Sequence, residues 1–122
     1  MEDDEFRSMI ATVIGAVTKV PEVTKLAGSG KVFSFGAADA PVNWYLEFAG
    51  EPVFGEGVPD QFDVRALMTK ADWLEMLKGN LSATQAMLRR RLKVEGSMAA
   101  ISALSMDALV RCYKQYAEDT QA

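Results

Sequence analysis

The sequence contains no histidine and only one cysteine, Cys112. The lack of histidine removes the commonest metal ligand and the commonest general base of enzymes, and one cysteine cannot form a disulfide within the chain. No residues have the spacing of a metal site, a nucleophile elbow or a phosphate-binding loop. The sequence therefore predicts no metal, no cofactor and no catalytic residues. Cys112 is expected to be a small buried apolar residue.

Long apolar runs and an excess of positive charge are missing too. No stretch approaches the roughly 20 uninterrupted apolar residues of a membrane-spanning helix. The acidic residues 2–5 are the opposite of the basic start of a secretory signal, so we expect a cytoplasmic protein. The formal net charge of −4 argues against nucleic acid as a partner and predicts at most transient contact with a membrane.

The composition that remains is that of an ordinary globular protein. Apolar residues make up 49% of the 122 residues and charged residues 25%, which is close to average usage. This favours a single domain over residues 1–122, large enough to bury a core and to enclose a cavity.

Apolar residues follow the period of a helix near both ends of the chain and the period of strands between them. A first helix, which Pro21 ends, is predicted from the stripe Phe6, Met9, Ile10, Val13, Ile14 and Val17. Strands are predicted over residues 31–37, 43–48 and 53–54. A helix is expected over residues 98–104, and a last one carries the stripe Leu109, Cys112, Tyr113 and Tyr116.

The block from Asp63 to Gly96 predicts a strand, a helix, a shorter helix and a strand. Thr69 and Ser82 each begin a capping pattern that precedes a helix, and Gly79 stands where the first of these helices is expected to end. The whole order predicts an α+β fold. Its sheet is expected to have about five strands, mostly antiparallel or mixed, with helices covering mainly one face.

This block also resembles the sterol carrier protein type two (SCP2) sterol-binding domain family. The residues that match the family pattern, without a gap, are Asp63, Val64, Met68, Asp72, Trp73, Leu77, Gly79, Leu81, Ala86, Leu92, Lys93, Val94 and Gly96. The residues that depart from it are Asn80, Met87, Arg90 and Ser97. Arg90 is the most serious departure, because the family usually has a glycine there and glycine tolerates positive φ. The resemblance implies an apolar tunnel between sheet and helices that takes lipids.

The apolar side chains of the strands are either plain core or the wall of such a tunnel. Methionine suits ligands of different shape but also fills cores, so the residues leave this open and the resemblance favours the tunnel. The predicted ligand contacts on the sheet are Phe35, Trp44, Leu46, Phe48, Val64 and Met68. Those on the helices are Trp73, Leu77, Met87, Leu104, Leu109 and Tyr113. The C-terminal helix is the predicted gate.

Arg89, Arg90 and Arg91, with Lys93, form the one cationic cluster of the sequence. They are either a solvated face or a docking point for anionic headgroups, acyl-CoA phosphates or an acidic partner, since guanidinium groups pair well with phosphate oxygens.

We therefore expect a non-enzymatic carrier of one apolar molecule, such as a sterol-like, fatty acyl, phospholipid or polyprenyl compound. One alternative is an interaction module, as a homodimer or as a subunit beside a partner enzyme. Another is an accessory that holds a hydrophobic intermediate for that enzyme. An enzyme would need an acid such as Asp63 or Glu47 in the cavity with a raised pKa.

Overall fold

The computed structural model of the chain describes residues 1–97, 104 and 106–121. The helix predicted over residues 98–104 thus falls almost wholly outside the described residues. The helices are α1 (Asp3–Val17), α2 (Pro21–Thr24), α3 (Lys70–Leu77), α4 (Ala83–Leu88) and α6 (Met106–Gln121). The strands are β1 (Val32–Ala37), β2 (Asn43–Glu47), β3 (Val53–Glu56), β4 (Val64–Met68) and β5 (Lys93–Gly96). The predicted order of elements is confirmed for this part of the chain.

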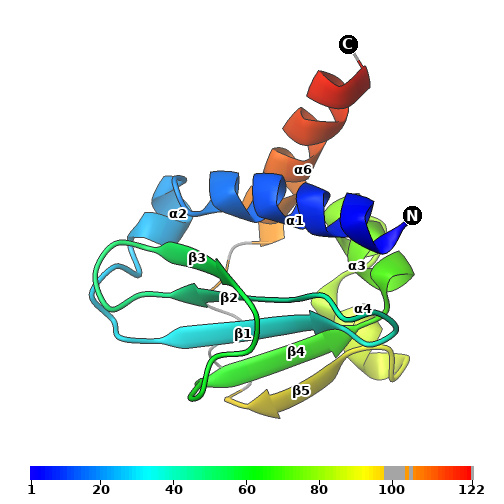
Figure 1. The fold of residues 1–122 in the computed structure, drawn as a ribbon. Helices are drawn as coiled ribbons and strands as arrows, with labels where there is room; N and C mark the ends of the chain where they lie inside the picture. Colours follow the sequence, from blue (N-terminus) through cyan, green and yellow to red (C-terminus); the bar gives the residue numbers. More distant parts are fainter. Residues whose placement is uncertain (98–103, 105, 122) are drawn as a thin grey trace.

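The five strands form one mixed sheet in the order β3-β2-β1-β4-β5. Only β1 and β4 run parallel among these pairs, and the other neighbours are antiparallel. The helices lie on one face of the sheet, with α1 lying across the strands and α6 rising away from the sheet beside α1 (Figure 1). The predicted α+β fold with a five-stranded mixed sheet and helices mainly on one face is therefore confirmed.

Successive side chains of a strand point to opposite faces of the sheet. Here the apolar ones face the helices and the polar ones face the other way. Trp44 and Leu46 are 2% exposed, and Val64 and Met68 of β4 are at most 1% exposed. On the outer face the Arg65 guanidinium donates to Ser34 Oγ at 2.7 Å and to Asn43 Oδ1 at 2.9 Å. These bonds join β4, β1 and β2 across the sheet.

The helix ends follow the capping chemistry that the sequence predicts. Thr69 Oγ1 accepts a hydrogen bond from the Asp72 amide at 3.2 Å. Ser82 and Gln85 form a complete capping box before α4. Gly79 ends α3 with a φ of +84°, a left-handed conformation that glycine adopts at little energetic cost.

Helix α1 buries its whole predicted stripe, from Phe6 to Val17, against the sheet and the other helices. Its start is held by Lys70 Nζ, which donates to Asp3 Oδ1 at 2.6 Å. Helix α6 is held less firmly. Among its described side chains only Ala108 is fully buried, and Cys112 is half-buried rather than buried as expected.

Arg90 occupies the left-handed region, with a φ of +57°. We expect Arg90→Gly to stabilise the fold by about 0.5–1 kcal/mol. The left-handed region costs a non-glycine residue about 1–2 kcal/mol, and the greater freedom of glycine in the unfolded chain offsets part of this gain. The measurement is urea unfolding, where the midpoint should rise without a change in slope.

The matched control is Arg89→Gly. Arg89 has a φ of −90°, so glycine relieves nothing there and the midpoint should fall. A lower midpoint for Arg90→Gly as well would mean that the Arg90 side chain contributes more than its backbone conformation costs.

Candidate functional site

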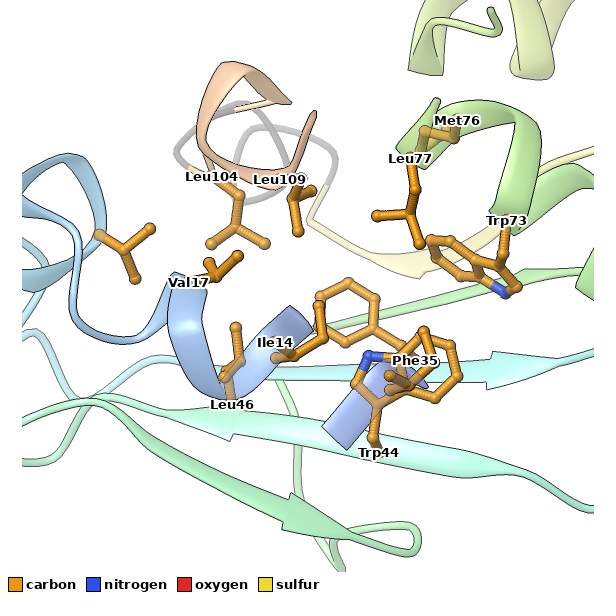
Figure 2. A pocket seen from close by; sticks show the side chains of 12 residues that line it. Ile14, Val17, Phe35, Trp44, Leu46, Trp73, Met76, Leu77, Leu104 and Leu109 are labelled. Carbon is orange, nitrogen blue, oxygen red and sulfur yellow. The ribbon is translucent and has the colours of Figure 1, made fainter. Parts of the chain in front are cut away.

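A narrow apolar cavity lies between the inner face of the sheet and the helices (Figure 2). Its volume is about 30 Å³, whereas one water needs at least about 10–15 Å³. The side chains that line it are Ile10, Ile14, Val17, Val23, Phe35, Trp44, Leu46, Trp73, Met76, Leu77, Leu104 and Leu109. In this conformation the cavity has room for a water-sized guest and not for a lipid chain.

A second apolar cavity of about 40 Å³ adjoins the first. The two share the side chains of Phe35, Trp73, Met76, Leu104 and Leu109. The second extends toward α4 and β5, where Ala83 and Leu92 line it. The described residues thus enclose two small neighbouring cavities, and the open tunnel that the resemblance implies stays a prediction.

Three aromatic rings form the floor and one side of the first cavity. Phe35 and Trp44 stack on the sheet with centroids 5.8 Å apart, and Trp73 of α3 meets Trp44 edge-on at 5.3 Å. Trp73 Nε1 donates to the Gly36 carbonyl at 2.8 Å, which ties α3 to β1. Packing and this hydrogen bond together fix the Trp73 ring.

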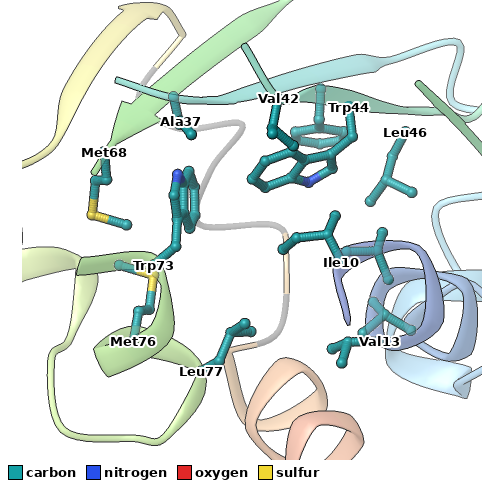
Figure 3. Packing of buried hydrophobic residues seen from close by; sticks show 14 of the residues in the cluster. Ile10, Val13, Ala37, Val42, Trp44, Leu46, Met68, Trp73, Met76 and Leu77 are labelled. Carbon is teal, nitrogen blue, oxygen red and sulfur yellow. The ribbon is translucent and has the colours of Figure 1, made fainter. Parts of the chain in front are cut away.

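The indole of Trp44 differs from that of Trp73 in its hydrogen bonding. Trp44 is 2% exposed, yet its Nε1 has no hydrogen-bond partner among the residues that the structure describes. Figures 2 and 3 both show this nitrogen on the ring edge turned away from β2, toward the helices. The sheet wall therefore carries a donor that the described part of the protein leaves unused.

Most of the predicted contact residues meet at this cavity. Those that line it are Phe35, Trp44, Leu46, Trp73, Leu77, Leu104 and Leu109. Phe48, Val64 and Met68 lie outside both linings, fully buried in the core, and Phe48 packs against Phe33 with centroids 5.4 Å apart.

Met87 and Tyr113 also lie outside the two linings. Met87 is 38% exposed on α4. The half-buried Tyr113 lies beside Tyr116 on α6, with ring centroids 6.1 Å apart. Their part in binding a ligand stays a prediction.

Sequence reasoning did not assign five of the residues that line the first cavity to the site. They are Ile10, Ile14 and Val17 of α1, Val23 of α2 and Met76 of α3. The stripe on α1 was visible as a buried helix face. Periodicity shows which face of a helix is buried, but it does not show whether that face meets side chains or a void.

The acids that an enzyme would require lie elsewhere. Asp63 is exposed, and its Oδ2 accepts from the Val32 amide at 2.7 Å, at the start of β1. Glu47 lies on the outer face of the sheet beside Glu56 and Asp60. Among the described residues no group of acids and cysteine has the arrangement of a metal site. The cavity wall offers packing and a hydrogen-bond donor rather than acid or base chemistry.

The last residue of α4 and the three residues after it form an exposed cationic and apolar segment, which we call the arginine tip (Leu88–Arg91). Leu88 is 80% exposed. Arg91 reaches Asp72 Oδ1 at 3.3 Å, whereas the guanidinium groups of Arg89 and Arg90 bind no carboxylate in the described chain. Leu92, the next residue, lines the second cavity. The tip therefore lies beside one end of the two cavities.

Helix α6 closes the cavities from the side opposite the sheet. Leu109 lines both of them, while the C-terminal part of α6 extends away from the sheet (Figure 1). Arg111 forms an ion pair with Glu22 of α2 and lowers the pKa of the Glu22 carboxyl by hydrogen bonding. Burial raises the pKa of the neighbouring Cys112 thiol. None of the described helices is long and apolar enough to cross a membrane.

Comparison with known proteins places this geometry in a known group. The model of the SCP-2 sterol transfer family matches residues 16–108. The solution structure of the sterol carrier protein domain 2 of Helicoverpa armigera is similar, with a TM-score of 0.65 and 15% identity over 93% of this chain and 94% of that one. No curated protein sequence matches the chain.

Two further solved structures share the fold. UbiJ-SCP2, described as a ubiquinone synthesis protein, has a TM-score of 0.59 and 12% identity over 89% of this chain and 88% of that one. A variant of the sec-alkyl sulfatase PisA1 has a TM-score of 0.63 and 16% identity over 85% of this chain, but only 16% of that chain. At these identities the likeness shows the fold alone.

Proposed function

The chain belongs to the SCP-2 sterol transfer family, and on that premise we propose that residues 1–122 act as one domain that carries a single apolar molecule between its sheet and helices. The carrier performs no chemistry on this molecule. The apolar cavity under α6 is the observation on which the proposal rests. The classes that fit are sterol-like, fatty acyl, phospholipid and polyprenyl compounds. The cytoplasmic setting remains a prediction of the sequence.

The small size of the cavities is what an empty carrier is expected to have. A void of about 300 Å³, the lower end for ligand pockets, would cost about 7 kcal/mol at roughly 24 cal/mol per Å³. That approaches the whole stability of a domain, about 5–15 kcal/mol. In a carrier of this kind the two layers are therefore expected to stay in contact, and a ligand enters by separating them.

Helix α6 is the element that separates most easily. Its described side chains are mostly half-buried or exposed, whereas α1 buries six residues. Its ion pair to Glu22 is exposed, and such pairs contribute about 0–1 kcal/mol. We propose that α6 swings away as the gate, with its apolar stripe as the surface that the ligand replaces.

The arginine tip offers a surface for contact with the membrane from which the lipid comes. Leu88 is exposed and apolar. The guanidinium groups of Arg89 and Arg90, which pair with no carboxylate of the described residues, follow it in a chain of net charge −4. That combination suits the surface of an anionic membrane, where the phosphates pair with guanidinium groups and the apolar side chain enters the interface. In this proposal the contact is transient.

The sequence also permits an interaction module, in which a partner helix or a second copy fills the groove. If the carrier proposal holds, an organic extract of freshly purified protein contains an apolar compound at about one molecule per chain. Native mass spectrometry of the same sample should show the loaded monomer or an assembly with the same ratio. An empty dimer that takes up neither fatty acid, sterol nor phospholipid would instead support the module.

The gate is tested through Cys112, the one cysteine of the chain. Arg111→Gln removes the ion pair to Glu22, so the open form should gain up to about fivefold in population, as a loss of about 1 kcal/mol implies. Release of a bound fluorescent fatty acyl ester should accelerate. Labelling of Cys112 by a thiol reagent should accelerate too, once the rate is divided by the thiolate fraction, because loss of the Arg111 charge raises the pKa of the Cys112 thiol. Lys114→Gln, on the same helix and exposed, is the control. Equal release rates in all three proteins would show that the ion pair to Glu22 does not hold α6 closed.

The tip is tested with vesicles. Arg89→Gln with Arg90→Gln should weaken binding to phosphatidylcholine vesicles containing phosphatidylglycerol by about fivefold for each arginine, since each contributes about 1 kcal/mol near such a surface. Added salt should remove the difference. The control is Lys25→Gln with Lys31→Gln. It also removes two positive charges, here near the start of β1, whereas the tip lies near the other end of that strand. This control should bind the vesicles like the unchanged protein. Equal losses in both pairs would exclude a specific tip.

A further inference from the structure

The wall of the apolar cavity holds a polar group whose partner is missing among the described residues. Trp44 and Trp73 lie edge to face, 5.3 Å apart, in the same lining. Trp73 Nε1 donates to the Gly36 carbonyl, 2.8 Å away. Nε1 of Trp44 has no such acceptor. A buried indole N–H normally finds a hydrogen-bond partner, so this exception needs an explanation.

The Trp44 N–H is turned toward the layer boundary and is not sealed in the core. Only 2% of the Trp44 surface is exposed to solvent. No fully enclosed nitrogen or oxygen of the described side chains lacks a partner, so this nitrogen borders open space. Figure 3 shows it on the side of Ile10 and the helices. When the layers separate to admit a guest, the N–H faces that guest.

Water is a poor occupant for this position. An internal water needs about two to four polar partners. The other side chains in the lining are aliphatic, aromatic or methionine, and the indole N–H of Trp73 is already used. A water here would have one partner among these side chains. Displacing such a weakly held water favours binding.

We propose that Trp44 is the residue that selects the ligand, by donating its Nε1–H to a neutral carbonyl oxygen, that of a ketone or an ester, set within an otherwise apolar body. This inference rests on the proposed carrier function and adds a substrate class to it. A charged group is disfavoured, because the lining offers no compensating charge and burial of an unpaired charge is costly. An alkane of equal size leaves the donor unpaired.

The expected selectivity follows from that difference. A ligand that satisfies a buried donor should bind about tenfold more tightly than a matched ligand that does not, since an unpaired buried group loses the free energy of its hydration. Sites built around a polar group reject analogues that lack its partner for the same reason. The Trp44 donor thus separates carbonyl compounds from hydrocarbons that fill the same space.

The test compares 2-undecanone with undecane on the ¹⁵N-labelled protein. Its two tryptophan indole signals are assigned with Trp44→Phe and Trp73→Phe. Both probes should shift the methyl signals of Leu77 and Leu109, which line the cavity. Only the ketone should move the Trp44 indole proton downfield, leave that of Trp73 in place and bind about tenfold more tightly. In Trp44→Phe the ketone should lose its advantage.

The outcomes separate the two proposals. If both probes bind equally and the Trp44 indole signal does not respond, the selective role of Trp44 is overturned while the carrier function stands. If neither probe shifts a cavity signal, both proposals fail. The comparison of probes on the unchanged protein decides the question even where Trp44→Phe does not fold.

Discussion

The structure depends on the contact between the apolar inner face of the sheet and the helices that cover it. This contact provides most of the buried apolar surface, so it holds the fold together. It is also the place where the cavities lie, so the same contact must yield when a ligand enters. The protein resolves this conflict by distributing the contact unequally. Helix α1 buries its full stripe, whereas α6 buries little, so in the proposed carrier α1 is the fixed wall and α6 the movable one.

The outer face of the sheet makes that division possible. The helices lie on the other face, so the strands must keep their shape when α6 moves. Arg65 spans three strands through its bonds to Ser34 and Asn43, and Trp73 joins α3 to the backbone of β1. A sheet braced from both sides behaves as a rigid plate. In the proposed carrier, opening is then confined to the α6 side, and the aromatic floor keeps its geometry.

Much of the fold could be predicted from the sequence, because local chemistry determines it. The period of two residues placed Trp44 and Leu46 on the inner face, and the caps at Thr69 and Ser82 marked two helix starts. The resemblance raised the question of φ at Arg90, and the backbone there is left-handed. Each of these features depends on a few neighbouring residues.

The site could be predicted only in part, because a cavity depends on the layer opposite. Val64 and Leu46 alternate in the same way, yet Leu46 borders the void and Val64 packs in the core. Met87 belongs to a helix of six residues, too short for its apolar spacing to show which side faces inward. The N–H of Trp44, which has no acceptor among the described residues, has no signature in the sequence, since hydrogen bonding by an indole depends on where backbone carbonyls fall in space.

In the proposed carrier, the free energy gained when a lipid enters and the free energy lost when α6 gives up its contact are both small. Small opposing terms suit the exchange of a lipid with a membrane. A chain of about 16 methylenes gains roughly 13 kcal/mol on leaving water, but a lipid that starts in a membrane is already out of water. The driving force is then the difference between two apolar surroundings, reduced by the contact that α6 gives up. In the proposed carrier, the weak contact of α6 and the position of the arginine tip next to Leu92, which lines the second cavity, would give a lipid a short route from the surface to the interior. In the selective role proposed for Trp44, a single hydrogen bond is small beside the whole transfer energy, yet it would decide between guests because the apolar terms nearly cancel.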